Sequence, residues 1–141
     1  MGSGMTALVL HREARDVLVR LALAAYPHEG CGILAGRREA RRVVLSRAFA
    51  CDNIAVDRRR NFLVDPLDHL AAERSAEAAG EEVLGIWHSH PDGQPIPSET
   101  DRVQAWGGWY YLIAATTPGG LDGLRAWRLD GEHFVEEVIN P

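Results

Sequence analysis

The sequence lacks lysine and long apolar runs. All fifteen basic residues are arginine, which we attribute either to a high-GC coding sequence or to avoidance of modification on lysine. No run of about 18 apolar residues occurs, and no basic segment followed by a hydrophobic one opens the chain. We therefore expect a cytoplasmic protein with neither a membrane span nor a secretion signal.

Cysteine is scarce, and so is net positive charge. Two thiols, Cys31 and Cys51, are present, and in a cytoplasmic chain such a pair is usually reduced, so we expect no disulfide. The net charge of −5 argues against a nucleic-acid partner that is bound through a strongly basic surface. We interpret the short arginine clusters as solvated surface.

The 141 residues suffice for one compact domain whose core needs no disulfide. The first four residues, Met-Gly-Ser-Gly, have the composition of a cloning leader, and Met5 follows them as a second start. We therefore predict a leader over residues 1–4 and a single domain over residues 5–141.

Periodicity predicts helices and strands interleaved along the chain. Apolar spacing indicates a helix over 12–25, which Pro27 ends, and a second helix over 67–79. The glycine-bounded apolar run 30–36 predicts a buried strand, with 41–50 as its hairpin partner. A third, short helix is expected at 98–106, and the remaining strands at 8–10, 62–64, 83–90, 109–115, 124–129 and 134–139.

Two histidines end the predicted strand 83–90. Because strand side chains alternate, His88 and His90 face the same side of the sheet. Asp101 lies one turn into the next helix, and the proline-rich loop before it can turn that helix start back towards the histidines. Two imidazoles and one carboxylate leave a fourth position open on a zinc ion, as in catalytic sites. We therefore predict one Zn²⁺ per chain, held by His88, His90 and Asp101.

Water bound to such a metal needs a group that takes its proton. Zinc lowers the pKa of bound water towards about 7, and a carboxylate is the usual proton acceptor. We predict that Glu29 has this role, because it lies where a helix meets a buried strand and the sheet can place it opposite the strand that ends at His88. The other glutamates on turns, exposed helix faces or beyond the motif are interpreted as surface charge: Glu39, Glu73, Glu77, Glu81, Glu82 and Glu99.

Ser98 allows two interpretations. Ser98 and Asp101 have the spacing of a capping box, which is a common helix start. Alternatively, the Ser98 hydroxyl donates to the oxyanion that develops in acyl-transfer chemistry. Both roles are compatible if the hydroxyl caps the helix in one state and donates in another.

These residues together form one discontinuous motif: His88-Ser89-His90-Pro91, Pro97-Ser98 and Asp101, preceded by Glu29 within Glu-Gly-Cys-Gly-Ile-Leu-Ala-Gly. The motif resembles the JAMM motif of the MPN-domain metallopeptidases, and the likeness covers nearly the whole chain, including Asn53 and segment 62–66. This likeness is greatest to the small stand-alone prokaryotic members of the family. It implies an α/β fold with a single MPN-like domain, in which a curved mixed sheet is flanked by about three helices. It also implies zinc on the three predicted ligands, Glu29 as acid/base and Ser98 supporting the intermediate.

Family members of this size cleave after the C-terminal glycines of ubiquitin-like or sulfur-carrier proteins. The resemblance therefore implies a zinc-dependent peptidase or isopeptidase whose partner is a carrier protein ending in Gly-Gly. A tail without side chains can lie as an extra strand along a sheet edge that leads to the metal, and we expect partner contacts in the loop 52–61. The carrier, the leaving group (cysteine, another amino acid or a lysine-linked protein) and the oligomeric state stay open.

Two alternatives remain within the resemblance. A DNA-repair-associated JAMM-like family has a similar histidine stretch, but Glu29 and segment 62–66 favour the peptidase branch. A zinc-stabilised, non-catalytic MPN binding module is the other alternative, and the presence of all five motif residues favours an enzyme over it. A zinc deaminase is disfavoured because its His-x-Glu and Cys-x-x-Cys pattern is absent.

Overall fold

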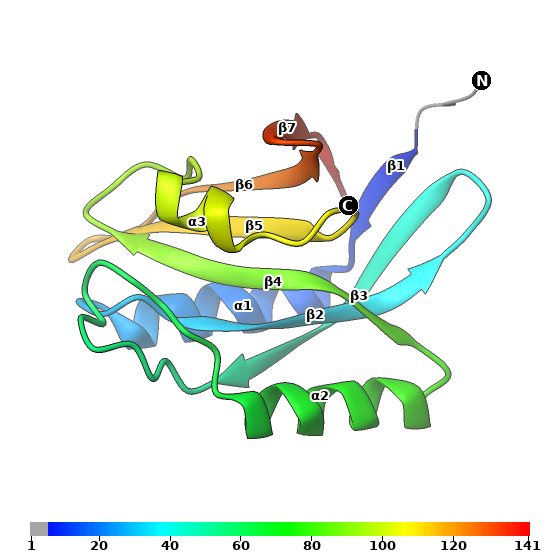
Figure 1. Cartoon of the computed structure of the whole chain (residues 1–141), viewed down its shortest axis with the longest axis horizontal. Helices are drawn as coiled ribbons and strands as arrows, with labels where there is room; N and C mark the ends of the chain where they lie inside the picture. Colours follow the sequence, from blue (N-terminus) through cyan, green and yellow to red (C-terminus); the bar gives the residue numbers. More distant parts are fainter. Residues whose placement is uncertain (1–5) are drawn as a thin grey trace.

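A computed structural model describes residues 6–141 (Figure 1). Over these residues the chain forms one eight-stranded sheet and three helices. The predicted leader lies outside the described residues. The elements follow one another as β1 (Ala7–Leu10), α1 (Arg12–Ala25), β2 (Cys31–Arg38), β3 (Arg42–Cys51), α2 (Pro66–Ala78), β4 (Glu82–Pro91), α3 (Glu99–Gln104), β5 (Tyr110–Thr117), β6 (Gly120–Asp130), β7 (His133–Glu137) and β8 (Ile139–Asn140).

The sheet is mixed and strongly curved. Its strand order is β7-β6-β5-β4-β2-β3-β1-β8, and β4 runs parallel to β5 and antiparallel to β2. The two outermost strands, β7 and β8, are separated in the chain by Val138 alone. One residue spans only about 3.5 Å, so the sheet must bend until its two edges approach each other. The predicted curved mixed sheet with flanking helices is confirmed.

Helix α1 covers one face of the sheet and packs into the hydrophobic core there (Figure 1). It buries Ala14, Leu18 and Ala22, which recur at helical spacing. Trp87 packs into this face and donates from its indole nitrogen to the Phe49 carbonyl at 2.9 Å. A Cβ at Gly32 would lie only 2.3 Å from the Trp87 indole nitrogen, so this close packing requires glycine there.

Helix α2 covers the opposite face, which also carries the side chains of His88 and His90. Asp65 begins the helix by accepting a hydrogen bond from the Leu67 amide, and Pro66 occupies its first turn. Its buried residues are Ala72 and Ala76, whose small side chains allow the helix to pack closely on the sheet. No helix in the described part of the chain is both long and apolar enough to cross a membrane.

Three predictions about individual elements are wrong. Residues 62–64 form a single bridge, Asn53 with Val64, because the Leu63 amide donates to the Asn53 side chain and not to a neighbouring strand. The predicted strand 134–139 is two strands, since β7 pairs with β6 whereas β8 pairs with β1. Helix α3 ends at Gln104, two residues before the predicted end.

Candidate active site

The three predicted metal ligands meet where β4 ends and α3 begins. The Nε2 atoms of His88 and His90 lie 3.1 Å apart, and each lies 3.2 Å from Asp101 Oδ2. In a tetrahedral site with ligand bonds of about 2.0–2.1 Å, ligand atoms are separated by about 3.3 Å. The donor atoms and their spacing therefore fit one transition-metal ion such as zinc.

The two histidines are held in orientations that suit metal binding. His90 Nδ1 lies 2.8 Å from the Gln94 carbonyl, and because a carbonyl only accepts, Nδ1 carries the proton and Nε2 is left free to bind a metal. His88 is fully buried, and the Phe62 ring stacks on it with centroids 4.3 Å apart. Burial lowers the pKa of His88, which keeps this imidazole neutral, as a ligand must be.

Asp101 is aimed at the histidines by the start of α3. Its amide donates to Ser98 Oγ at 3.0 Å, and its Oδ2 accepts from the Ser98 amide at 2.9 Å. This is a capping box, so that interpretation of Ser98 is confirmed. Burial alone would raise the pKa of Asp101, but its close contacts with His88 and His90 and the hydrogen bond from the Ser98 amide lower it below its usual range. The carboxylate that faces the histidines is therefore ionised at neutral pH.

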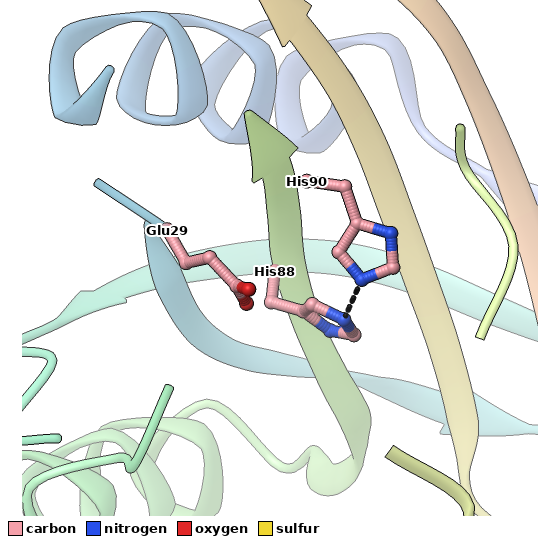
Figure 2. Close-up of side chains that lie close together, drawn as sticks. All are labelled: Glu29, His88 and His90. Atoms are coloured by element: carbon pink, nitrogen blue, oxygen red, sulfur yellow. Dashed lines mark hydrogen bonds between the residues drawn. The ribbon is translucent and has the colours of Figure 1, made fainter. Parts of the chain in front are cut away.

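Glu29 approaches the histidines from the neighbouring strand. It lies two residues before β2, whose Cys31 pairs with His88, so it lies opposite the strand that carries the two histidines, as expected. Figure 2 shows its carboxylate directed at the two imidazoles. One carboxylate oxygen and one nitrogen of each histidine lie within 4.8 Å of one another.

The Glu29 carboxyl is buried and short of hydrogen-bond partners. The residue is 6% exposed, and its Oε1 is buried without a hydrogen-bond partner in the described chain. A buried polar atom of this kind normally has a partner, which a metal, a water molecule or a substrate would supply. Burial raises the pKa of Glu29 to about 8, with Asp101 adding to the rise and His90 opposing it. A carboxyl group near this value can take up and release a proton around neutral pH.

A cavity of about 690 Å³ opens beside Glu29. It lies between the end of α1 and the loop that follows β3, and its lining includes His28, Glu29, Asp52, Asn53 and Arg58. Part of the loop 52–61, where partner contacts were predicted, therefore faces the candidate base. The lining of the cavity includes Glu29 but none of the three candidate metal ligands.

A second group of carboxylates, Asp52, Asp65 and Asp68, also lies within ligand distance of one another. Two of them have structural roles, since Asp65 caps α2 and Asp68 accepts from the Asp52 amide at 2.8 Å. We therefore interpret this group as part of the helix start and not as a second site.

Sequence reasoning missed three contributors to the site. Phe62 was placed in a strand but stacks on His88, Gln94 orients His90 through its carbonyl, and Asn53 holds the backbone of Glu29. Neither a contact between two rings nor the position of a main-chain carbonyl leaves a pattern in a sequence. Asn53 belongs to the part of the sequence that resembles the metallopeptidase family. Its role could not be predicted, however, because all its hydrogen-bond partners are main-chain atoms.

Residues 11–130 match the family model of prokaryotic homologs of the JAB domain. The chain belongs to this family. It is 36% identical over 134 residues to the desampylase of Haloferax volcanii, with 92% of each chain covered. It is 38% identical over 130 residues to the probable TtuB-protein conjugate cleaving protease of Thermus thermophilus, with 92% of this chain and 78% of the relative covered. It is also 27% identical over 138 residues to the CysO-cysteine peptidase of Mycobacterium tuberculosis, covering 94% and 90%.

Solved structures of related proteins have the same fold. A solution structure from Desulfitobacterium hafniense matches with a TM-score of 0.80 at 27% identity, covering 94% of this JAB-family chain and 90% of the other. A JAB1/MPN domain protein from Archaeoglobus fulgidus matches with a TM-score of 0.57 at 22% identity, covering 98% and 99%. The predicted family, the MPN-like fold and the hydrolase class are thereby confirmed. The structure brings the predicted site residues together, whereas their individual roles stay predictions.

Proposed function

We propose that this chain is a zinc-dependent peptidase or isopeptidase that hydrolyses the bond after the C-terminal Gly-Gly of a ubiquitin-like or sulfur-carrier protein. The observation that carries the proposal is the triangle of His88, His90 and Asp101 donor atoms at 3.1–3.2 Å, with the carboxylate of Glu29 beside it. The substrate class is supported by the relatives, which are named for removal or cleavage of protein conjugates and for a carrier-cysteine peptide.

His88, His90 and Asp101 would hold one zinc ion, which supplies a Lewis acid for the scissile carbonyl and lowers the pKa of a bound water to about 7. Glu29 takes the proton of the attacking water on its carboxylate. Glu29 then acts as the general acid and passes this proton to the leaving amine. The amine then departs as a neutral group.

Ser98 can serve the cap and the reaction at once. Its oxygen accepts a hydrogen bond from the Asp101 amide, which leaves the hydroxyl proton free, because a serine hydroxyl is one donor and has two acceptor lone pairs. We assign that proton to the developing oxyanion of the substrate. The two interpretations of Ser98 therefore do not compete, and no change of state is needed between them.

The expected route of the carrier tail needs revision. Strand β4 is flanked by β2 and β5, and the outer strands of the sheet are β7 and β8, so no free strand edge runs beside the histidines. The tail instead reaches Glu29 through the cavity lined by the loop after β3. A Gly-Gly tail suits this route because it lacks side chains and can pass close to other main-chain atoms.

A panel of carriers tests the activity. Carriers ending in Gly-Gly are extended by one cysteine or linked through an isopeptide bond to a lysine peptide, and the products are identified by mass spectrometry. We expect cleavage after the last glycine by the zinc-loaded protein. A protein that binds zinc stoichiometrically but cleaves no member of the panel would instead be a binding module.

The same panel tests the base. Glu29→Gln should retain zinc and lose about 10²–10⁴-fold in kcat, the usual contribution of a positioned general base. Glu77→Gln is the matched control, because Glu77 lies on the exposed surface of α2. Turnover of Glu29→Gln at the wild-type rate would remove Glu29 from the mechanism.

A further inference from the structure

Asn53 uses its whole hydrogen-bonding capacity on main-chain groups of its own loop and of Glu29. Its Nδ2 donates to the carbonyls of Glu29 at 2.9 Å and Asn61 at 3.0 Å. Its Oδ1 accepts from the amides of Ala55 and Leu63, each at 3.0 Å. An asparagine amide has two donor hydrogens and two acceptor lone pairs, and all four are engaged. The side chain thus replaces the pairing that a regular strand would give this segment.

The segment 52–64, which we name the base loop, holds Glu29 from both sides. The Glu29 amide donates to the Arg58 carbonyl at 2.7 Å, and the Glu29 carbonyl accepts from Asn53. Glu29 precedes the first residue of β2, so the sheet does not fix these two groups. The orientation of the Glu29 backbone therefore depends on the base loop.

The base loop also reaches the metal ligands. Phe62 stacks on the His88 ring, and the amide of its neighbour Leu63 donates to Asn53 Oδ1. One side chain is therefore bonded both to the backbone of the candidate base and to the segment that packs on a candidate ligand. Asn53 is the point at which these two parts of the site are joined.

We infer that Asn53 is a positioning residue for the hydrolysis, acting through Glu29. This inference rests on the proposed role of Glu29 as the base. Asn53 contacts the carbonyl of Glu29 and not its carboxylate, so its contribution is to fix where the carboxylate points. Displacement of a reacting group by about 1 Å can cost on the order of 10²-fold in rate. Asn53 makes no hydrogen bond to β4 or α3, which carry the three candidate metal ligands.

Two substitutions test the donor hydrogens of Asn53 separately from its acceptor oxygen. Asn53→Asp keeps the shape and both acceptor positions but removes the two donors, and Asn53→Ala removes all four bonds. Asn61 supplies matched controls, since it lies in the same loop, is exposed, and makes no side-chain hydrogen bond with the described part of the chain. Asn61→Asp and Asn61→Ala therefore repeat the chemical change without the contacts.

We expect both Asn53 variants to lose about 10–100-fold in kcat, with KM and zinc content close to wild type. The Asn61 variants should behave as wild type. In the Glu29→Gln background, Asn53→Ala should cause no further loss of the residual rate, because a residue that acts through Glu29 has nothing left to position. A full and independent loss in that background, or a loss that follows the zinc content, would overturn the inference.

Amide hydrogen exchange in the metal-free protein gives a readout that does not depend on activity. The Glu29 amide should exchange faster in Asn53→Ala than in wild type or Asn61→Ala, because the loop carrying the Arg58 carbonyl is no longer fixed. Unchanged exchange at Glu29 together with a wild-type kcat would refute the positioning role. Failure of the proposed function itself would look different, because Glu29→Gln would then turn over at the wild-type rate whatever Asn53 does.

Discussion

The two halves of the proposed active site, one for the metal and one for the base, are built in different ways. The metal half comes from one stretch of chain, in which β4 supplies His88 and His90 and the capping box of α3 supplies Asp101. The base half is assembled from distant segments, since Glu29 is placed by the pairing of β2 with β4 and by the base loop. Regular elements fix the proposed metal ligands, whereas an irregular loop fixes the proposed base.

This difference predicts that the two halves respond differently to change. A defect in the metal half should remove the metal and the activity together. A defect in the base half should leave the metal in place and lower only the rate. The variants below test this division, beginning with the largest expected effect.

Replacement of a ligand should give the largest loss. His88→Ala is expected to weaken zinc binding by more than about 100-fold, since even residues that only support a ligand contribute 10–100-fold. Turnover of carriers should be abolished with it. Elemental analysis and competition with a chelator measure the zinc content and the zinc affinity. Glu29→Gln is the comparison variant, because it should lose activity while it retains zinc. Stoichiometric zinc in His88→Ala would mean that the ion is bound elsewhere.

Ser98 lies in the metal half, but we assign its hydroxyl a part in the reaction. Its variants therefore test whether a residue of the metal half can lower the rate without loss of the metal. Ser98→Gly keeps a residue that is tolerated at a helix start and should cost only a few tenths of a kcal/mol in stability. The hydroxyl is lost, so kcat should fall about 10²-fold if that hydroxyl stabilises the oxyanion. Ser98→Thr keeps both functions and serves as the control. Wild-type kcat in Ser98→Gly would leave Ser98 as a helix cap alone.

The smallest effect on activity is expected outside both halves, at Glu81. The interpretation of Glu81 as surface charge is wrong, because its side chain is 7% exposed and accepts from Ser46 at 2.6 Å and from Arg47 at 2.7 Å. Burial would raise its pKa, but these hydrogen bonds lower it below the ordinary value of 4.5. Glu81→Gln should cost about 1 kcal/mol in unfolding free energy and leave kcat and zinc content unchanged.

The lowered pKa of Glu81 also fixes the sign of a pH effect. A carboxylate whose pKa is lower in the folded state contributes its stability above the unfolded pKa, near 4.5, and loses it as the pH falls through the folded value. Wild type should therefore lose its advantage over Glu81→Gln as the pH drops below about 4.5. Urea unfolding of the two proteins at pH 7 and at acidic pH measures this, and an advantage that grows towards acid would contradict it.

The sequence predicted the metal half well because its information is local. Alternation in a strand places His88 and His90 on one face, and the capping-box spacing places Asp101 in the first turn of α3. The ends of α1 and the presence of β1 to β6 also follow from local periodicity. These features depend on residues within one or two turns or strands of each other.

The base half could be predicted only in part, because its information is non-local. Glu29 was identified as the candidate, but its distance from His88 depends on the register of β2 against β4. The support from Asn53 and Phe62 depends on how an irregular segment folds, which no periodicity encodes. The division of β7 from β8 escaped prediction for the same reason, since β8 pairs with β1 at the other end of the chain.

A crystal structure with zinc bound, measured at the zinc absorption edge, tests the arrangement most directly. It should show one anomalous peak bonded to Nε2 of His88 and of His90 and to the Asp101 carboxylate, with the Glu29 carboxylate facing the open side of the ion. A peak elsewhere, for example at Asp52, Asp65 and Asp68, or a Glu29 side chain turned away from the ion, would contradict the account.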